Sequence, residues 1–178
     1  MTFARPASAV AAPDDAPMGV RAGASVPPAA APATTYLHPG QIFVAAEPTA
    51  VMTILGSCVA VCLWDGQLKV GGMNHYLLPH WVNEGEASPR FGNVAIQRLI
   101  ERLAALGSQT AHLQAKVFGG ACVLEAFRTR HLGTKNVEVA RRFLQEASIP
   151  VVHEDVGGQR GRKLIFHVDD GATSVKLL

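Results

Sequence analysis

The chain has 178 residues, of which 48% are hydrophobic and 17% are charged, a composition that can bury a core and excludes global disorder. Sixteen Lys and Arg against fourteen Asp and Glu leave a formal charge of +2, too mild to indicate a nucleic-acid-binding or membrane-surface protein. No apolar run reaches the length of a membrane-spanning helix, and three cysteines, an odd number, favour a reducing compartment. These features predict one soluble, cytoplasmic domain without direct membrane insertion.

Residues 1–35 differ from the rest because they are largely Ala and Pro. Proline removes helix hydrogen bonds, and alanine has too little apolar surface to offset the entropy lost on ordering. A secretory signal is the alternative interpretation, but Pro13, Asp14 and Asp15 interrupt the apolar stretch that a signal requires. We therefore predict a disordered tail over residues 1–35 and a folded domain over residues 36–178.

The domain begins with segments typical of strands, at residues 41–45, 51–63 and 69–78. Gly56, Ser57 and Cys58 break the second segment, and Asp65-Gly66 predicts a turn before the third. Further strands are predicted at residues 115–118, 151–156, 163–168 and 173–177. Glycine-containing turns join the last three of these, which predicts an antiparallel meander.

Two segments have the apolar spacing of amphipathic helices. The first is expected to be capped by Asn93 and to stop at Gly107, with Ile96, Leu99, Ile100 and Leu103 on its inner face. The second is expected from about Asn136 to just before Pro150, with Ala140, Phe143, Leu144 and Ala147 facing inward. Two such helices on mixed or antiparallel sheets predict an α+β domain.

The segment that most strongly indicates a catalytic site is the break between strands that contains Cys58. Glycine at Gly56 lets the backbone turn sharply, so the thiol is expected at a strand end. Antiparallel pairing across the following turn would bring His75 close to Cys58. Imidazole can take the thiol proton, and the thiolate can then attack an acyl carbon. Thr53 is a candidate to orient the imidazole, by its hydroxyl or its backbone carbonyl, and the N–H groups of Ser57 and Cys58 are candidates for an oxyanion hole.

Each of these residues also has a structural interpretation. Free cysteines are commonly buried, so Cys58 could be a core residue, as Cys62 and Cys122 are expected to be. His75 could be a hydrogen-bonded core histidine. A zinc site built from Cys58, Cys62, His75 and His80 has suitable ligand atoms, but their spacings do not match ribbons or fingers, and no metal site is predicted.

Two glycine pairs and a group of basic residues complete the candidates. Gly119-Gly120 and Gly157-Gly158 lack the residues of a phosphate-binding loop and predict turns. The basic residues indicate either a solvated face or a docking patch for an acidic protein; they are Arg141, Arg142, Arg160, Arg162 and Lys163.

Six motifs in a fixed order resemble the CheD family, the chemoreceptor glutamine deamidases of bacterial and archaeal chemotaxis. They are LGSCVAVCL at residues 55–63, GGMNHYLLP at 71–79, RFGN at 90–93, KVFGGA at 116–121, GTKN at 133–136 and DVGGQRGR at 155–162. The resemblance covers residues 36–178. It implies the fold of the catalytic domain of cytotoxic necrotizing factor, in which mixed sheets pack as a sandwich flanked by helices.

The resemblance also implies a site and a reaction. The family's nucleophile, histidine and threonine fall on Cys58, His75 and Thr53. The implied reaction hydrolyses glutamine side-chain amides of methyl-accepting chemoreceptors to glutamate and ammonia through a thioester, with glutamyl methyl esters as possible further substrates and no cofactor. A CheC-type phosphatase is a possible partner.

Two other functions remain open at this level. The domain could be a non-catalytic adaptor that docks on receptors or on the phosphatase, although an adaptor needs none of Cys58, His75 and Thr53. It could also be a thiol hydrolase of free amides or small esters.

Overall fold

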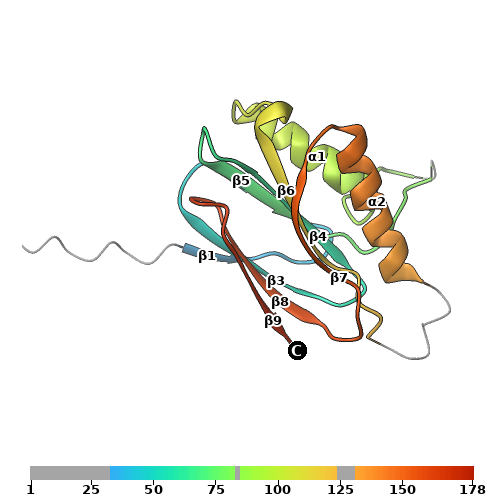
Figure 1. Cartoon of the computed structure of the whole chain (residues 1–178). Coiled ribbons are helices and arrows are strands. Elements are labelled where there is room, and N and C mark those ends of the chain that lie inside the picture. The colour runs from blue at the N-terminus through green and yellow to red at the C-terminus, as the bar shows by residue number, and fades with distance from the viewer. Residues whose placement is uncertain (1–32, 83–84, 124–130) are drawn as a thin grey trace, which may run out of the picture. The chain divides into compact units, whose positions relative to one another are not determined.

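The computed structural model describes residues 33–82, 85–123 and 131–178. Its strands form a four-stranded sheet of order β1-β3-β8-β9 and a five-stranded sheet of order β2-β5-β4-β6-β7 (Figure 1). Both sheets mix parallel and antiparallel pairs, and with two α-helices they confirm the predicted α+β class. In chain order the elements are β1 (Ala33–Tyr36), β2 (Ile42–Ala45), β3 (Thr49–Leu55), β4 (Val59–Asp65), β5 (Val70–Asn74), α1 (Gly92–Ala105), a short 3-10 helix (Thr110–His112), β6 (Leu113–Gly119), α2 (Leu132–Glu146), β7 (Val151–Val156), β8 (Arg162–His167) and β9 (Thr173–Leu177).

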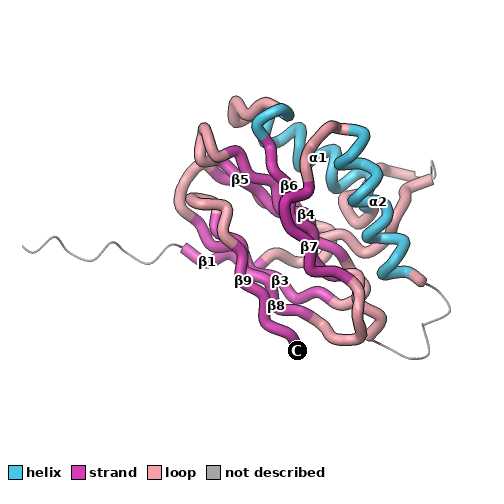
Figure 2. The backbone as a smooth tube through the Cα atoms, in the orientation of Figure 1, coloured by secondary structure: helices cyan, strands magenta, loops and turns pink. Residues whose placement is uncertain are grey.

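The five-stranded sheet is the middle one of three layers (Figure 2). The two helices cover one of its faces, and the four-stranded sheet packs against the other. Alternate side chains of β4 therefore enter different cores. Val59, Val61 and Leu63 lie in the core beneath the helices, whereas Ala60 and Cys62 lie in the core between the sheets.

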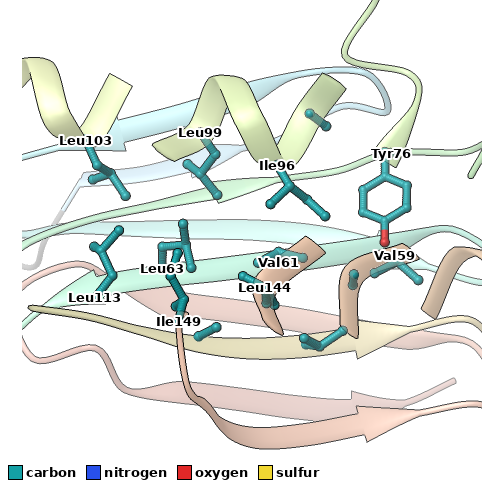
Figure 3. Close-up of a cluster of buried hydrophobic side chains, with 14 of the residues drawn as sticks. Val59, Val61, Leu63, Tyr76, Ile96, Leu99, Leu103, Leu113, Leu144 and Ile149 are labelled. Carbon is teal, nitrogen blue, oxygen red and sulfur yellow. The ribbon is translucent and has the colours of Figure 1, made fainter. Parts of the chain in front are cut away.

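The helices pack through the apolar stripes that the sequence predicts. Ile96, Leu99 and Leu103 of α1 and Leu144 of α2 are fully buried against the middle sheet (Figure 3). Burying a side chain of this size stabilises the fold by about 1.5–3 kcal/mol. Neither helix of the described chain combines the length and apolar character needed to cross a membrane.

The ends of α1 match the prediction at one end only. Gly107 follows the helix with φ of +93°, the left-handed conformation expected at a helix stop. At the other end the N-cap is Phe91, so the predicted capping role of Asn93 is wrong. The Asn93 side chain instead accepts a hydrogen bond from the Trp81 N–H at 3.0 Å, because the preceding loop folds back over the helix start.

The predicted meander of the last three strands is wrong in one respect. β8 and β9 do form an antiparallel pair, but β7 lies in the other sheet, parallel to β6. The reason is that α2 connects β6 to β7, and a strand that returns after a helical crossover pairs in parallel.

The chain enters the fold earlier than residue 36. β1 begins at Ala33 and runs parallel to β3, with Tyr36 opposite Met52. The β-branched pair Thr34 and Thr35 suits such a strand. The other residues of the predicted tail, 1–32, lie outside the described part of the chain.

Candidate active site

The break before β4 carries the chain from one sheet to the other and presents Cys58, which is half-buried. Backbone from the segment after β6 holds this turn: the Gly120 N–H donates to the Cys58 carbonyl and the Ala121 N–H to the Gly56 carbonyl, both at 2.8 Å. Gly119 lies so close that a Cβ there would collide with the Cys58 carbonyl, and its φ of +106° also favours glycine. The Gly119-Gly120 pair is not the separate turn that the sequence predicts: Gly119 ends β6, Gly120 follows it with φ of +68°, and this backbone supports the segment that carries Cys58.

Strand register places His75 near Cys58. Val59 and Tyr76 exchange backbone hydrogen bonds of 3.1 and 3.0 Å, which sets Cys58 opposite Leu77. His75 is then the diagonal neighbour of Cys58 on the same face, where Cα atoms are typically about 7–8 Å apart. No hydrogen bond joins their side chains in the described structure, and the buried Nε2 of His75 has no partner there.

Thr53 reaches His75 from the other sheet. The Thr53 Oγ1 lies 2.8 Å from His75 Nδ1 and 2.8 Å from the Leu37 carbonyl oxygen. A carbonyl can only accept, so the single hydroxyl hydrogen of Thr53 is donated to Leu37. Nδ1 of His75 must therefore donate to Thr53, which leaves the lone pair of the neutral ring on Nε2. The contact uses the Thr53 hydroxyl rather than its backbone carbonyl.

Burial keeps the Cys58 thiol and the His75 imidazole uncharged at pH 7. It lowers the pKa of His75 to about 4, and His38 acts in the same direction, so the imidazole is neutral at pH 7. Burial also raises the pKa of the Cys58 thiol, while its own backbone N–H opposes this effect. A neutral thiol and a neutral imidazole thus share one face of the sheet, an arrangement suited to general-base activation when a substrate arrives.

The turn also offers hydrogen-bond donors. Within the described residues, no backbone carbonyl accepts from the N–H groups of Ser57 or Cys58. Glycine also suits position 56 because there is little room for a side chain: a Cβ there would lie 3.3 Å from Cγ2 of Val123. These two N–H groups therefore stay candidates for the oxyanion donors that the sequence predicts.

Asn136 is a residue of this site that the sequence analysis did not single out. It is fully buried, and its Nδ2 donates to the carbonyls of Ser57 and Leu77, each at 2.9 Å. The sequence signal was its place at the end of the GTKN motif and at the start of a predicted helix. The helix in fact begins earlier, at Leu132. Its residue Gly133 packs so closely on Gly120 that a Cβ would collide with the Gly120 carbonyl.

The other predicted candidates lie apart from this site or have structural partners. Cys62 is buried between the sheets, and burial raises its thiol pKa strongly. His80 Nε2 lies 2.8 Å from the Arg142 guanidinium, and the described residues contain no group of His, Cys, Asp or Glu able to hold a metal.

The predicted basic face is divided. Arg162 is only 5% exposed and contacts Asp155 and the Gly157 carbonyl, so it holds the loop after β7 instead of joining a surface patch. Arg141 forms a bidentate pair with Glu154, from Nε to Oε1 and from Nη2 to Oε2. Gly157 and Gly158 have φ of +75° and +73°, as expected for a turn.

The fold and the site define a class of protein: an α+β sandwich in which a threonine and a histidine meet, near a half-buried cysteine, where the two sheets join.

Residues 77–177 match the family described as CheD chemotactic sensory transduction. A protein of Anaeromyxobacter dehalogenans named probable chemoreceptor glutamine deamidase CheD 1 is 58% identical over 169 residues, covering 94% of this chain and 96% of its own length. Similarly named proteins of Sulfurimonas denitrificans and Trichlorobacter lovleyi are 46% and 47% identical, covering 79% and 76% of this chain and 92% and 85% of their own lengths. The chain belongs to the CheD family.

Proposed function

We propose that this protein hydrolyses the side-chain amide of specific glutamines in methyl-accepting chemoreceptors, giving glutamate and ammonia. The observation that carries the proposal is the hydrogen-bond chain from Leu37 through Thr53 to His75, because it leaves a basic Nε2 on the face that Cys58 shares. The names of the relatives, chemoreceptor glutamine deamidases, supply the substrate class.

In the first half of the reaction, His75 Nε2 takes the thiol proton as the Cys58 sulfur forms a bond to the carboxamide carbon. The amide oxygen becomes negatively charged and is stabilised by the N–H groups of Ser57 and Cys58. The carbon–nitrogen bond then breaks, and the proton on Nε2 passes to the leaving nitrogen, which departs as ammonia. The product is a thioester between Cys58 and the glutamyl side chain.

In the second half, water attacks the thioester while Nε2 accepts one of its protons. The carbon–sulfur bond breaks, the sulfur recovers the proton, and glutamate is released. An imidazole whose pKa is about 4 is a weak base but, once protonated, a strong acid, which favours protonation of the poor leaving group. A glutamyl methyl ester would pass through the same thioester with methanol as the leaving group.

The direct test is mass spectrometry of a receptor cytoplasmic fragment incubated with the protein or with a Cys58→Ala variant. Conversion of particular glutamines to glutamates by the wild type alone is expected. A Cys58→Ala variant that converts the same glutamines overturns the thiol mechanism. A fragment that binds both proteins and is converted by neither supports the adaptor, alone or with a CheC-type phosphatase, in place of the enzyme. Faster turnover of free glutamine than of the fragment would favour the small-amide hydrolase.

A second measurement separates a neutral thiol from a preformed ion pair. Because burial raises the pKa of Cys58, its alkylation by iodoacetamide should keep accelerating from pH 7 to beyond pH 9, the ordinary pKa of a thiol. Rapid alkylation that is constant from pH 6 upward would contradict the neutral pair. Peptide mapping distinguishes Cys58 from Cys62, which is expected to remain unlabelled while the protein is folded.

A further inference from the structure

Asn136 connects α2 to both strands of the site. Its Nδ2 donates to Ser57, which precedes the nucleophile, and to Leu77, which lies opposite it in the register. Its own backbone carbonyl accepts a hydrogen bond from the Tyr76 hydroxyl at 2.7 Å. The Tyr76 side chain lies in the core beneath the helices (Figure 3). Three hydrogen bonds thus tie one helix residue to the segments that carry Cys58 and His75.

The bond to Ser57 fixes the direction of the next N–H group. In a trans peptide the C=O and N–H bonds point in opposite directions, and the described chain contains no cis peptide. Because the Ser57 carbonyl points toward Asn136, the Cys58 N–H must point away from α2. No described backbone carbonyl accepts from this N–H, and it lowers the pKa of the Cys58 thiol against the effect of burial.

Asn136 holds this position at an energetic cost. Its Oδ1 is buried and has no hydrogen-bond partner in the described structure. Rotating the amide by half a turn would place Oδ1 against two carbonyl oxygens, so only the observed orientation satisfies Ser57 and Leu77. Buried polar atoms without a partner are rare, and local departures from such rules concentrate at functional sites.

We propose that Asn136 is a positioning residue for the oxyanion hole. By holding the Ser57 carbonyl toward α2, it keeps the Cys58 N–H directed at the negative charge that develops on the substrate amide oxygen. Without this bond the Ser57–Cys58 peptide can rotate, and a carbonyl oxygen would then face the charge in place of a donor. The inference rests on the proposed deamidation, since a non-catalytic adaptor develops no such charge.

The test compares wild type with Asn136→Asp, which keeps the shape but cannot donate to both carbonyls, and with Asn136→Ala, which removes both donors. With a receptor fragment as substrate, we expect kcat to fall about 10- to 100-fold while KM changes less than about twofold, because the donor acts on the transition state. Alkylation of Cys58 by iodoacetamide creates no oxyanion, so its rate should fall much less than kcat, by no more than the rise in thiol pKa that follows when the Cys58 N–H turns away. An unchanged kcat overturns the proposal. A parallel loss of alkylation also overturns it, since Asn136 would then position the sulfur itself.

Ser108→Ala is the matched control for stability. Ser108 is buried and donates a hydrogen bond to Asp65 at 2.6 Å. Asp65 is the last residue of β4, at the far end of this strand from Cys58. Assayed below the melting temperature of each variant, Ser108→Ala should lose stability and keep kcat. If it loses as much activity as the Asn136 variants, the effect is one of general stability and the proposal fails. Equal deamidation by wild type and Asn136→Asp overturns the positioning role alone, whereas no deamidation by wild type overturns the proposed function with it.

Discussion

Thr53 shows how much of the site depends on one side chain. Its hydroxyl contacts Leu37, which follows β1, and His75, which follows β5, although these residues are far apart in the sequence. Only a group that is donor and acceptor at once can satisfy both partners. The proton position on His75, and with it the free lone pair on Nε2, follows from this single hydroxyl.

Replacing Thr53 by Val keeps the shape of the side chain and removes the hydroxyl. We expect kcat for deamidation to fall at least about tenfold, because the His75 ring is no longer oriented for proton transfer. The free energy of unfolding should fall by about 1–3 kcal/mol, since the Leu37 carbonyl and His75 Nδ1 remain buried without a partner. Thr53→Ser, assayed in parallel, should restore most activity. Full activity in Thr53→Val would contradict the assigned role.

His75 also makes stability depend on pH. Its folded pKa of about 4 lies below the ordinary value of 6.5, so the unfolded chain binds the proton more tightly. Stability should therefore be complete above pH 6.5 and decrease as the pH falls toward 4, with a total loss of about 3 kcal/mol. Urea denaturation of wild type and His75→Gln at several pH values measures this. The variant should lose less stability than wild type over the same interval, and identical pH profiles would contradict the prediction.

At the scale of elements, the close contact between α2 and the segment after β6 positions the site. Gly133 of α2 and Gly120 approach so closely that side chains at either position would meet backbone of the other. This contact brings Asn136 within hydrogen-bond distance of Ser57 and Leu77. Gly119-Gly120 and the GTKN motif at residues 133–136 are therefore parts of one contact, although they lie apart in the sequence.

Gly133→Ala tests this contact, because the expected change in stability has the opposite sign to that in an exposed helix. In an exposed helix, alanine in place of glycine stabilises by about 0.8–1.0 kcal/mol. Here the added Cβ would collide with the Gly120 carbonyl, so we expect lower stability in chemical denaturation and reduced deamidation. Gly158→Ala is the control: its surroundings are open, although its φ of +73° makes alanine mildly unfavourable there. A stabilised Gly133→Ala protein would show that α2 does not depend on the contact.

At the scale of the whole molecule, the site lies where the two sheets meet. Thr53 comes from the four-stranded sheet, whereas Cys58 precedes β4 and His75 follows β5, both strands of the other sheet. β1 forms one edge of the four-stranded sheet and leads directly to Leu37, so an edge strand positions the carbonyl that accepts the hydrogen bond from Thr53.

Two truncations should separate the tail from β1. Removing residues 1–32 should leave the melting temperature nearly unchanged, because that Ala- and Pro-rich segment has little apolar surface to bury. Removing residues 1–36 also deletes β1 and its four register pairs with β3, and leaves Leu37 at the chain end. We expect this second truncation to lower both the melting temperature and deamidation. Equal effects of the two truncations would contradict a structural role for β1.

Some features of this protein follow from the sequence alone because their causes are local. The break at residues 56–58, the turn at Asp65-Gly66 and the apolar stripes of both helices depend on residues that are neighbours or one helical turn apart. The diagonal relation of Cys58 and His75 follows from register across one short turn. The family motifs drew attention to the same residues.

Other features were decided only by the tertiary structure. The sheet to which β7 belongs, the use of Asn93 by Trp81 and the link from Asn136 to Ser57 all join segments that local patterns do not connect. The sequence marked Thr53 as a candidate, but not whether its hydroxyl or its carbonyl meets His75, nor that Leu37 accepts from it. Hydrogen bonds are directional and short, so their partners are determined only when packing has brought distant strands to their final positions.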